Sequence, residues 1–247
     1  MIRVRITRAR GSTPREAGAA MIVTQQTVQG TIGGGQLEYM AIDRARQMLA
    51  RDEAGATMDV PLGPEIGQCC GGRVELALTR IDEAPAAPEH PQVLIFGAGH
   101  VGRALSRALA LLPLRPILID QRASELAQAT GETRLTPLPE AEIRAAPAGT
   151  SFVILTHDHA LDFLLAAEAL RRLDAPYIGM IGSGTKLAQF RRFARAQGLD
   201  TGRLTCPIGA GYSHDKRPEI IAAFTAAELI GRLTSTASLL HKYPCDS

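Results

Sequence analysis

The chain has few cysteines, few lysines and no long apolar run. Four of its 247 residues are cysteine, and arginine supplies 24 of the 27 basic side chains. No apolar run reaches the roughly 18 residues that a membrane-spanning helix requires. The opening residues alternate Ile2, Val4 and Ile6 with arginines, a strand pattern that differs from the apolar core of a signal peptide. We therefore expect a cytoplasmic protein that makes no membrane contact.

The scarcity of cysteine also bears on covalent cross-links. Thiols stay reduced in the cytoplasm, so structural disulfides are not expected among Cys69, Cys70, Cys206 and Cys245. Adjacent cysteines do not match the ligand spacing of a structural zinc site. The formal net charge of +2 is too small to indicate a nucleic-acid surface, despite the arginine bias.

Two kinds of hydrophobic periodicity divide the chain. The first 81 residues are β-rich, with strands predicted near 2–8, 19–24, 27–32, 57–61 and 73–80 and one helix over 37–51. Residues 82–91 are rich in proline and resist both helix and sheet formation, as is typical of a linker. We predict a small β-rich N-terminal domain at 1–81 and a second domain at 92–247.

The second domain alternates apolar strands with helical patterns. The strand-like runs are VLIFG, PILID, SFVILT and YIGMIG, and a long helix is predicted from about residue 218 to 233. Such alternation predicts a doubly wound parallel sheet of the Rossmann type. The predicted fold class is therefore α/β, with a β-rich domain followed by a Rossmann-type domain.

A glycine turn follows the first strand of this second domain. Gly97, Gly99 and Gly102 form a GxGxxG fingerprint between a strand and a helix, and Asp120 ends the next strand. The glycines permit a tight turn, the approach of amides to a phosphate, and close helix-to-strand packing. Asp120 is placed to accept a hydrogen bond from a ribose 2′-hydroxyl, and His100 is a candidate to face the ligand. The pattern indicates a nucleotide such as NAD(P), whereas the alternative is a tight turn that binds nothing.

Two further loops carry groups suited to anions. Gly33, Gly34 and Gly35 precede the helix of the first domain and can form an anion-binding nest of backbone amides, although a flexible hairpin exit fits equally well. Arg15 lies in the polar turn GSTPRE, whose donors suit a phosphate or oxyanion. An ordinary turn has the same composition.

Cys69 and Cys70 form the most unusual segment, because two adjacent thiols are flanked by glycines. Thiolates ligate soft metals and carry sulfur. The alternative is a pair of small buried side chains. The surrounding glycines favour a functional interpretation.

Polar residues also follow the third and fourth strands of the Rossmann pattern. His157 and His159 follow the third strand at its carboxyl end, where ligands bind in open parallel sheets. Imidazoles there can bind a ligand or carry protons, whereas the alternative is a simple helix start capped by Asp158. The segment GSGTK at 182–186 adds a second anion-binding corner at the next strand.

These motifs together resemble the xanthine dehydrogenase accessory protein family, known as XdhC. The resemblance covers about residues 2–233 and rests on several ordered segments: RGSTPREAGAAMIV, GTIGGGQLE, QCCGG, VLIFGAGHVG, THDHALD, IGMIGSGTK and PIGAGYSHDKRPEIIAAFTAAELI. It implies a cytoplasmic chaperone and not an enzyme. Such a chaperone binds molybdenum cofactor, supports its sulfuration with a cysteine desulfurase, and inserts it into the molybdenum subunit of xanthine dehydrogenase in purine catabolism.

Carried over to this sequence, the resemblance assigns candidate roles. Cys69 and Cys70 are expected to face the molybdenum or the transferred sulfur, and the glycines at 33–35 to approach the pterin or phosphate. Arg15, His157 and His159 lie in matching motifs and are further candidates.

Two rival functions remain open, and each makes a distinct prediction. If the protein is an NAD(P)-dependent oxidoreductase, it should turn over nicotinamide in the presence of substrate. If it is a nucleotide-sensing module, it needs the Rossmann turn but not the thiols. In all three cases a homodimer is the expectation for this architecture.

Overall fold

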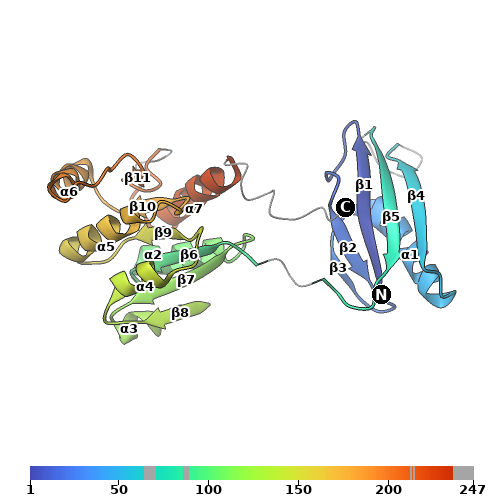
Figure 1. Ribbon diagram of the computed structural model, residues 1–247, viewed down its shortest axis with the longest axis horizontal. Coiled ribbons are helices and arrows are strands. Elements are labelled where there is room, and N and C mark those ends of the chain that lie inside the picture. Colours follow the sequence, from blue (N-terminus) through green and yellow to red (C-terminus); the bar gives the residue numbers. More distant parts are fainter. Residues whose placement is uncertain (64–70, 86–88, 212, 214, 236–247) are drawn as a thin grey trace. The chain divides into compact units, whose positions relative to one another are not determined.

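The computed structural model describes residues 1–63, 71–85, 89–211, 213 and 215–235. The chain divides into two compact units between residues 87 and 88 (Figure 1). The first is called the N-terminal unit and the second the Rossmann unit, and each is described by itself. In the described part of the chain, no helix is both long and apolar enough to cross a membrane.

The N-terminal unit is an antiparallel sheet with helix α1 packed against it (Figure 1). Its five strands have the order β3-β2-β1-β5-β4. The elements are β1 (Ile2–Arg10), β2 (Ala20–Val23), β3 (Val28–Gly30), α1 (Gly35–Ala50), β4 (Gly55–Pro61) and β5 (Arg73–Arg80).

A two-residue period builds the core of this unit. Ile2, Val4 and Ile6 of β1 are fully buried, so the intervening Arg3 and Arg5 lie on the other face of the sheet. The helix contributes one apolar stripe to the same core: Leu37, Ala41, Ala45 and Met48. Strand β3 ends at Gly30, earlier than the predicted residue 32, because the segment that follows adopts positive φ angles that leave the sheet.

The Rossmann unit contains a six-stranded parallel sheet with the order β11-β10-β9-β6-β7-β8. This is the doubly wound order, in which β6 is the first strand, so the topological switch point lies between the carboxyl ends of β6 and β9. The predicted α/β fold class is confirmed. The elements are β6 (Gln92–Phe96), α2 (His100–Leu109), β7 (Arg115–Asp120), α3 (Ala123–Leu126), β8 (Glu132–Leu135), α4 (Pro139–Ala145), β9 (Ser151–Ile154), α5 (His159–Arg171), β10 (Ile178–Met180), α6 (Gly184–Ala196), β11 (Leu204–Thr205) and α7 (Pro218–Ser235).

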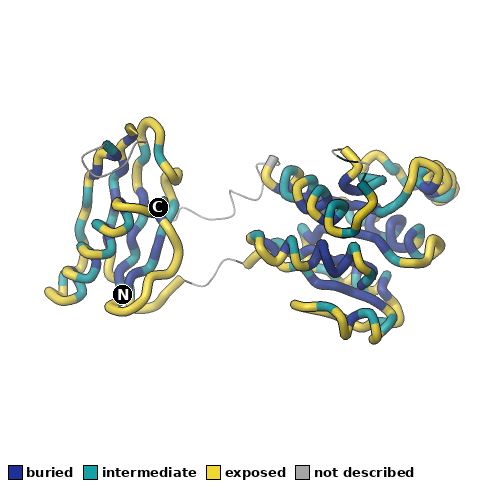
Figure 2. Tube along the Cα trace, turned by 180° about the vertical axis from the view of Figure 1, so that it is seen from behind, coloured by how far each residue is buried: buried dark blue, intermediate teal, exposed yellow. Residues whose placement is uncertain are grey.

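Both faces of the parallel sheet are buried, which explains its near-continuous apolar strands. Val93 and Ile95 of β6 pack into one core with α2 and α7, whereas Leu94 and Phe96 pack into another with α5 and α6. Figure 2 shows the strands as buried segments enclosed by more exposed helices and loops.

Strand β8 was not predicted from the sequence. Its residues Glu132–Leu135 are exposed or half-buried, and it is an edge strand that pairs in parallel with β7. The segment therefore lacks the apolar run that marked the central strands. Two short helices, α3 and α4, flank it.

The start of α2 lies directly against the end of β6. Gly97 has a φ of +115°, a conformation that favours glycine. A Cβ added to Gly102 would overlap the carbonyl oxygen of Gly97 and lie 2.9 Å from Leu155 Cδ1. Nothing lies within 4 Å of a Cβ added to Gly99. The third glycine of the fingerprint is thus required for packing, whereas the second faces open space.

Gly102→Ala is expected to destabilise the Rossmann unit by about 2 to 3 kcal/mol, because the added methyl overlaps backbone atoms. Gly99→Ala is the matched control and is expected to cost less than about 1 kcal/mol. Urea unfolding monitored by circular dichroism measures both. Equal stabilities of the two variants would contradict the close contact between α2 and β6.

Candidate functional site

Asp120, at the end of β7, is bound to both the glycine turn and Arg122. Its Oδ2 accepts from Ala98 N at 2.7 Å, and its Oδ1 accepts from Arg122 N at 2.9 Å. The Arg122 side chain donates from Nε to Oδ1 at 3.0 Å and from Nη2 to Oδ2 at 2.9 Å. Burial alone would raise the pKa of Asp120, but these donors outweigh it and lower the pKa. The carboxylate therefore stays ionised and holds the turn.

Arg103 of α2 holds the same turn from its other side. Its Nη1 donates to Ala98 O at 2.6 Å and to Glu125 Oε2 at 2.8 Å. Side chains thus bind both the N–H and the C=O of Ala98, which is itself buried. The glycine turn is held in place by the protein's own side chains.

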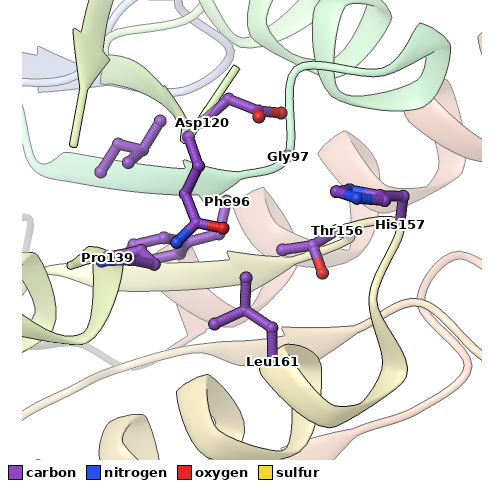
Figure 3. Close-up of a pocket in the computed structure, with 9 residues that line it drawn as sticks. Phe96, Gly97, Asp120, Pro139, Thr156, His157 and Leu161 are labelled. Carbon is purple, nitrogen blue, oxygen red and sulfur yellow. The ribbon is translucent and has the colours of Figure 1, made fainter. Parts of the chain in front are cut away.

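A pocket lies at the switch point, beside this turn (Figure 3). Figure 3 shows Asp120 and Gly97 on one side, with Thr156 and His157 on another and Leu161 below. Its lining comes from the ends of β6, β7 and β9 and from two helices: Phe96, Gly97, Ile119, Asp120, Gln121, Pro139, Thr156, His157 and Leu161. This is the crevice in which ligands bind in doubly wound sheets.

The predicted histidines have different positions. His157 is exposed and lines the pocket. His100 and His159 are exposed first residues of α2 and α5, and neither lines this pocket. Asp158 caps α5, since its side chain accepts from Ala160 N at 2.8 Å and from the next amide at 3.4 Å. The structure thus brings Gly97, Asp120 and His157 together.

A buried ion pair supports the wall of the pocket. Asp162 is fully buried and pairs with Lys186, whose side chain is 7% exposed. The other carboxylate oxygen of Asp162 accepts from Thr156 N at 3.0 Å and from Thr156 Oγ1 at 2.7 Å. The pair fixes the residue that precedes His157. From the sequence, Lys186 was recognised only as part of a polar corner and Asp162 was missed, although an acid in the apolar run ALDFLLAA is a recognisable signal.

Cys206 lies next to this ion pair. A Cβ added to Gly182 would lie 3.2 Å from Cys206 Sγ and 3.0 Å from Lys186 Cδ. Burial raises the pKa of the Cys206 thiol to about 11, although the nearby Lys186 acts in the opposite direction. Cys206 is a free thiol, and at neutral pH it is protonated and weakly nucleophilic.

In the N-terminal unit, a carboxylate of the chain occupies the glycine loop. Glu38 Oε1 accepts from Thr31 Oγ1 at 2.5 Å, from Ile32 N at 2.9 Å and from Gly33 N at 3.2 Å. Burial alone would raise the pKa of Glu38, but the Thr31 hydroxyl and the loop amides lower it. The segment expected to form an anion-binding nest therefore does bind an anion, and that anion is the side chain of Glu38.

Three loops of this unit come together. A Cβ added to Gly33 would lie 2.5 Å from Pro14 Cγ, so the loop at 30–35 contacts the loop that carries Arg15. A Cβ added to Gly72 would overlap the carbonyl oxygen of Ser12. The Gly71 amide donates to Leu62 O at 2.9 Å, which continues the pairing of β4 and β5.

The predicted thiols Cys69 and Cys70 lie outside the described residues. The described Gly72 lies beside the loop at 11–16. Arg15 is exposed and has no ion-pair partner among the residues that the structure describes. Within the same described ranges, no group of three histidine, cysteine or acidic side chains is placed to hold a metal ion.

Glu38→Gln is expected to destabilise the N-terminal unit by about 1 kcal/mol at pH 7, because charged acceptors form stronger hydrogen bonds than amides. The pKa of Glu38 is lowered in the fold, so its contribution is present above the unfolded-state value near 4.5 and is lost as pH falls through the folded-state value. Unfolding at pH 7 and at pH 3 checks both points. A stability difference that grows on acidification would contradict this assignment.

Asp162→Ala is expected to destabilise the Rossmann unit by about 3 to 5 kcal/mol, because it leaves the Lys186 ammonium buried without its partner. The double variant Asp162→Leu with Lys186→Met removes both charges and should recover most of that loss. Chemical unfolding of the three proteins tests the coupling. A double variant that is at least as unstable as Asp162→Ala would show that the pair is not coupled.

Comparison with known proteins agrees with both halves of this architecture. The XdhC Rossmann domain family matches residues 93–229, and the XdhC and CoxI family matches residues 1–61. YqeB, an uncharacterized protein of Escherichia coli strain K12, is 26% identical over 245 residues, which cover 90% of this chain. The chain spans 41% of the length of that relative.

A solved structure described as a xanthine dehydrogenase from Bacillus halodurans has the same fold. It superimposes with a TM-score of 0.78 at 19% identity, covering 96% of this chain and 93% of its own. The Rossmann family match alone spans more than half of the 247 residues. The chain belongs to the XdhC family.

Proposed function

We propose that this protein is an accessory factor in the maturation of a xanthine dehydrogenase, and that it carries molybdenum cofactor to that enzyme. Membership in the XdhC family supports an accessory role over a catalytic one. We further propose that the protein acts as a cytoplasmic homodimer. It receives sulfur from a cysteine desulfurase and delivers the cofactor to the molybdenum subunit.

The observation that carries the proposal is the convergence of three glycine-rich loops in the N-terminal unit. The contacts of Gly33 with the Pro14 side chain and of Gly72 with the Ser12 backbone leave no room for a side chain at position 33 or 72. These two positions therefore contribute backbone groups alone, which suits a ligand with many hydrogen-bonding edges.

The residues present fit molybdenum cofactor. Arg15 offers a guanidinium that has no ion-pair partner among the described residues for the cofactor phosphate, and the amide of Gly35 begins α1, where the helix dipole favours an anion. Cys69 and Cys70 supply thiols for the molybdenum or for the sulfur that it receives. When bound, the cofactor contributes the molybdenum and its exchangeable oxo or sulfido ligand.

The Rossmann unit has a separate role in this proposal, as a nucleotide site. The pocket beside Gly97 occupies the ligand-binding crevice of a doubly wound sheet, and His157 lies at its edge. The same observation supports the second candidate function, an NAD(P)-dependent oxidoreductase. That alternative requires substrate-dependent nicotinamide turnover by the purified protein.

Cys69→Ser and Cys70→Ser are each expected to lower reactivation of cofactor-free xanthine dehydrogenase by about tenfold or more, because hydroxyls are poor ligands for soft metals. The measurement is anaerobic incubation of the loaded protein with the apoenzyme, followed by assay of xanthine oxidation. Cys206→Ser is the matched control, since its thiol lies in the other unit and stays protonated. Full reactivation by both variants would show that these thiols do not contact the cofactor.

A further inference from the structure

Asp120 has no acceptor position left for a ribose hydroxyl. An ionised carboxylate offers about four lone-pair positions. Ala98 N, Arg122 N and the two Arg122 side-chain donors together make four hydrogen bonds to its oxygens. The Asp120 side chain is only 5% exposed. A nucleotide with a free 2′-hydroxyl would have to displace Arg122 before Asp120 could accept from it.

Arg122 keeps donors available at the same place. A guanidinium carries five N–H groups, and Arg122 gives one from Nε and one from Nη2 to Asp120, so three remain. Arg122 Nη1 lies 4.0 Å from Glu125 Oε1, while Glu125 forms its hydrogen bond with Arg103 at 2.8 Å. The Arg122 side chain is 35% exposed, and the neighbouring Asp120 and Gln121 line the crevice.

We infer that Arg122 makes the crevice select a dinucleotide phosphorylated on its adenosine ribose, NADP(H), over NAD(H). The inference rests on the proposed nucleotide role of the Rossmann unit. A 2′-phosphate brings negative charge and strong acceptor oxygens to the remaining N–H groups, and it leaves the pair of Asp120 with Arg122 intact. A 2′-hydroxyl forms no such contact, because the acceptor positions of the Asp120 carboxylate are already occupied.

The lining of the adjoining pocket has the apolar character that suits the face or edge of an adenine base. Ile119, Pro139 and Leu161 supply apolar surface, and Gln121 is held by a hydrogen bond from its Nε2 to Pro137 O at 2.9 Å. Gly99, where an added Cβ would meet no atom, leaves the approach to the first turn of α2 open for the pyrophosphate. The adenine base, the pyrophosphate and the ribose phosphate are thus matched by the apolar lining, the open approach at Gly99 and the Arg122 guanidinium, respectively.

Isothermal titration of the full-length protein with NADP⁺ and with NAD⁺ tests the inference. The wild-type protein is expected to bind NADP⁺ at least tenfold more tightly. Arg122→Gln should abolish the preference by weakening NADP⁺ binding, while NAD⁺ binds equally or more tightly because Asp120 is released. Arg107→Gln removes an exposed charge from α2 outside the pocket and is the matched control.

Three outcomes would overturn the inference: tighter or equal binding of NAD⁺ by the wild type, no binding of either dinucleotide, or an unchanged preference in Arg122→Gln. Arg122→Lys, which retains the charge and loses the paired donors, covers the case in which the glutamine variant fails to fold. It is expected to reduce the preference without reversing it, and an undiminished preference counts against the inference.

The result is independent of cofactor delivery. A wild-type protein that reactivates xanthine dehydrogenase and yet prefers NAD⁺ would refute the selectivity alone. A protein that prefers NADP⁺ and fails to deliver cofactor would refute the carrier role alone.

Discussion

Carboxylates from the chain itself hold both glycine-rich loops. Glu38 accepts hydrogen bonds from the loop at 31–33, and Asp120 accepts from the turn at Ala98. In each case the anion that these backbone amides bind is a carboxylate of the protein itself. Donors left unsatisfied at a half-buried position would destabilise the folded state. Neither loop depends on a ligand for its shape, so each can present a formed surface to one.

Because of this constraint, the residues around each loop are suited to hold a ligand and not to react with it. In the Rossmann unit, Asp120, the acid that could bind a ribose hydroxyl, is already bonded to Arg122, and the buried pair of Asp162 with Lys186 fixes Thr156, which precedes His157. In the N-terminal unit, three loops come together at Gly33 and Gly72, where no side chain would fit. Surfaces of this kind suit a protein that receives a cofactor and releases it, which is consistent with the accessory role proposed for this member of the XdhC family.

Local patterns in the sequence predicted most of the architecture. The alternation of Ile2, Val4 and Ile6 marked β1, and the glycine fingerprint placed Gly97 and Asp120 together because turn chemistry is a local property. Partners distant in sequence were not predictable in this way. Nothing in the motifs showed that Lys186 reaches Asp162, because that pair, 24 residues apart, depends on tertiary packing. The pairing of Arg122 with Asp120 is local, two residues apart, but the fingerprint did not indicate it either. The edge strand β8 was missed for a related reason, since a strand paired on one side needs little apolar sequence.

Equilibrium binding of molybdenum cofactor to the purified full-length protein, measured anaerobically and followed by transfer to cofactor-free xanthine dehydrogenase, tests the central claim most directly. Saturable binding and recovery of xanthine oxidation on transfer are expected, and binding should be retained when the Rossmann unit is saturated with nucleotide. Absence of cofactor binding, together with tight nicotinamide binding and substrate-dependent turnover, would contradict the carrier role and establish an oxidoreductase instead.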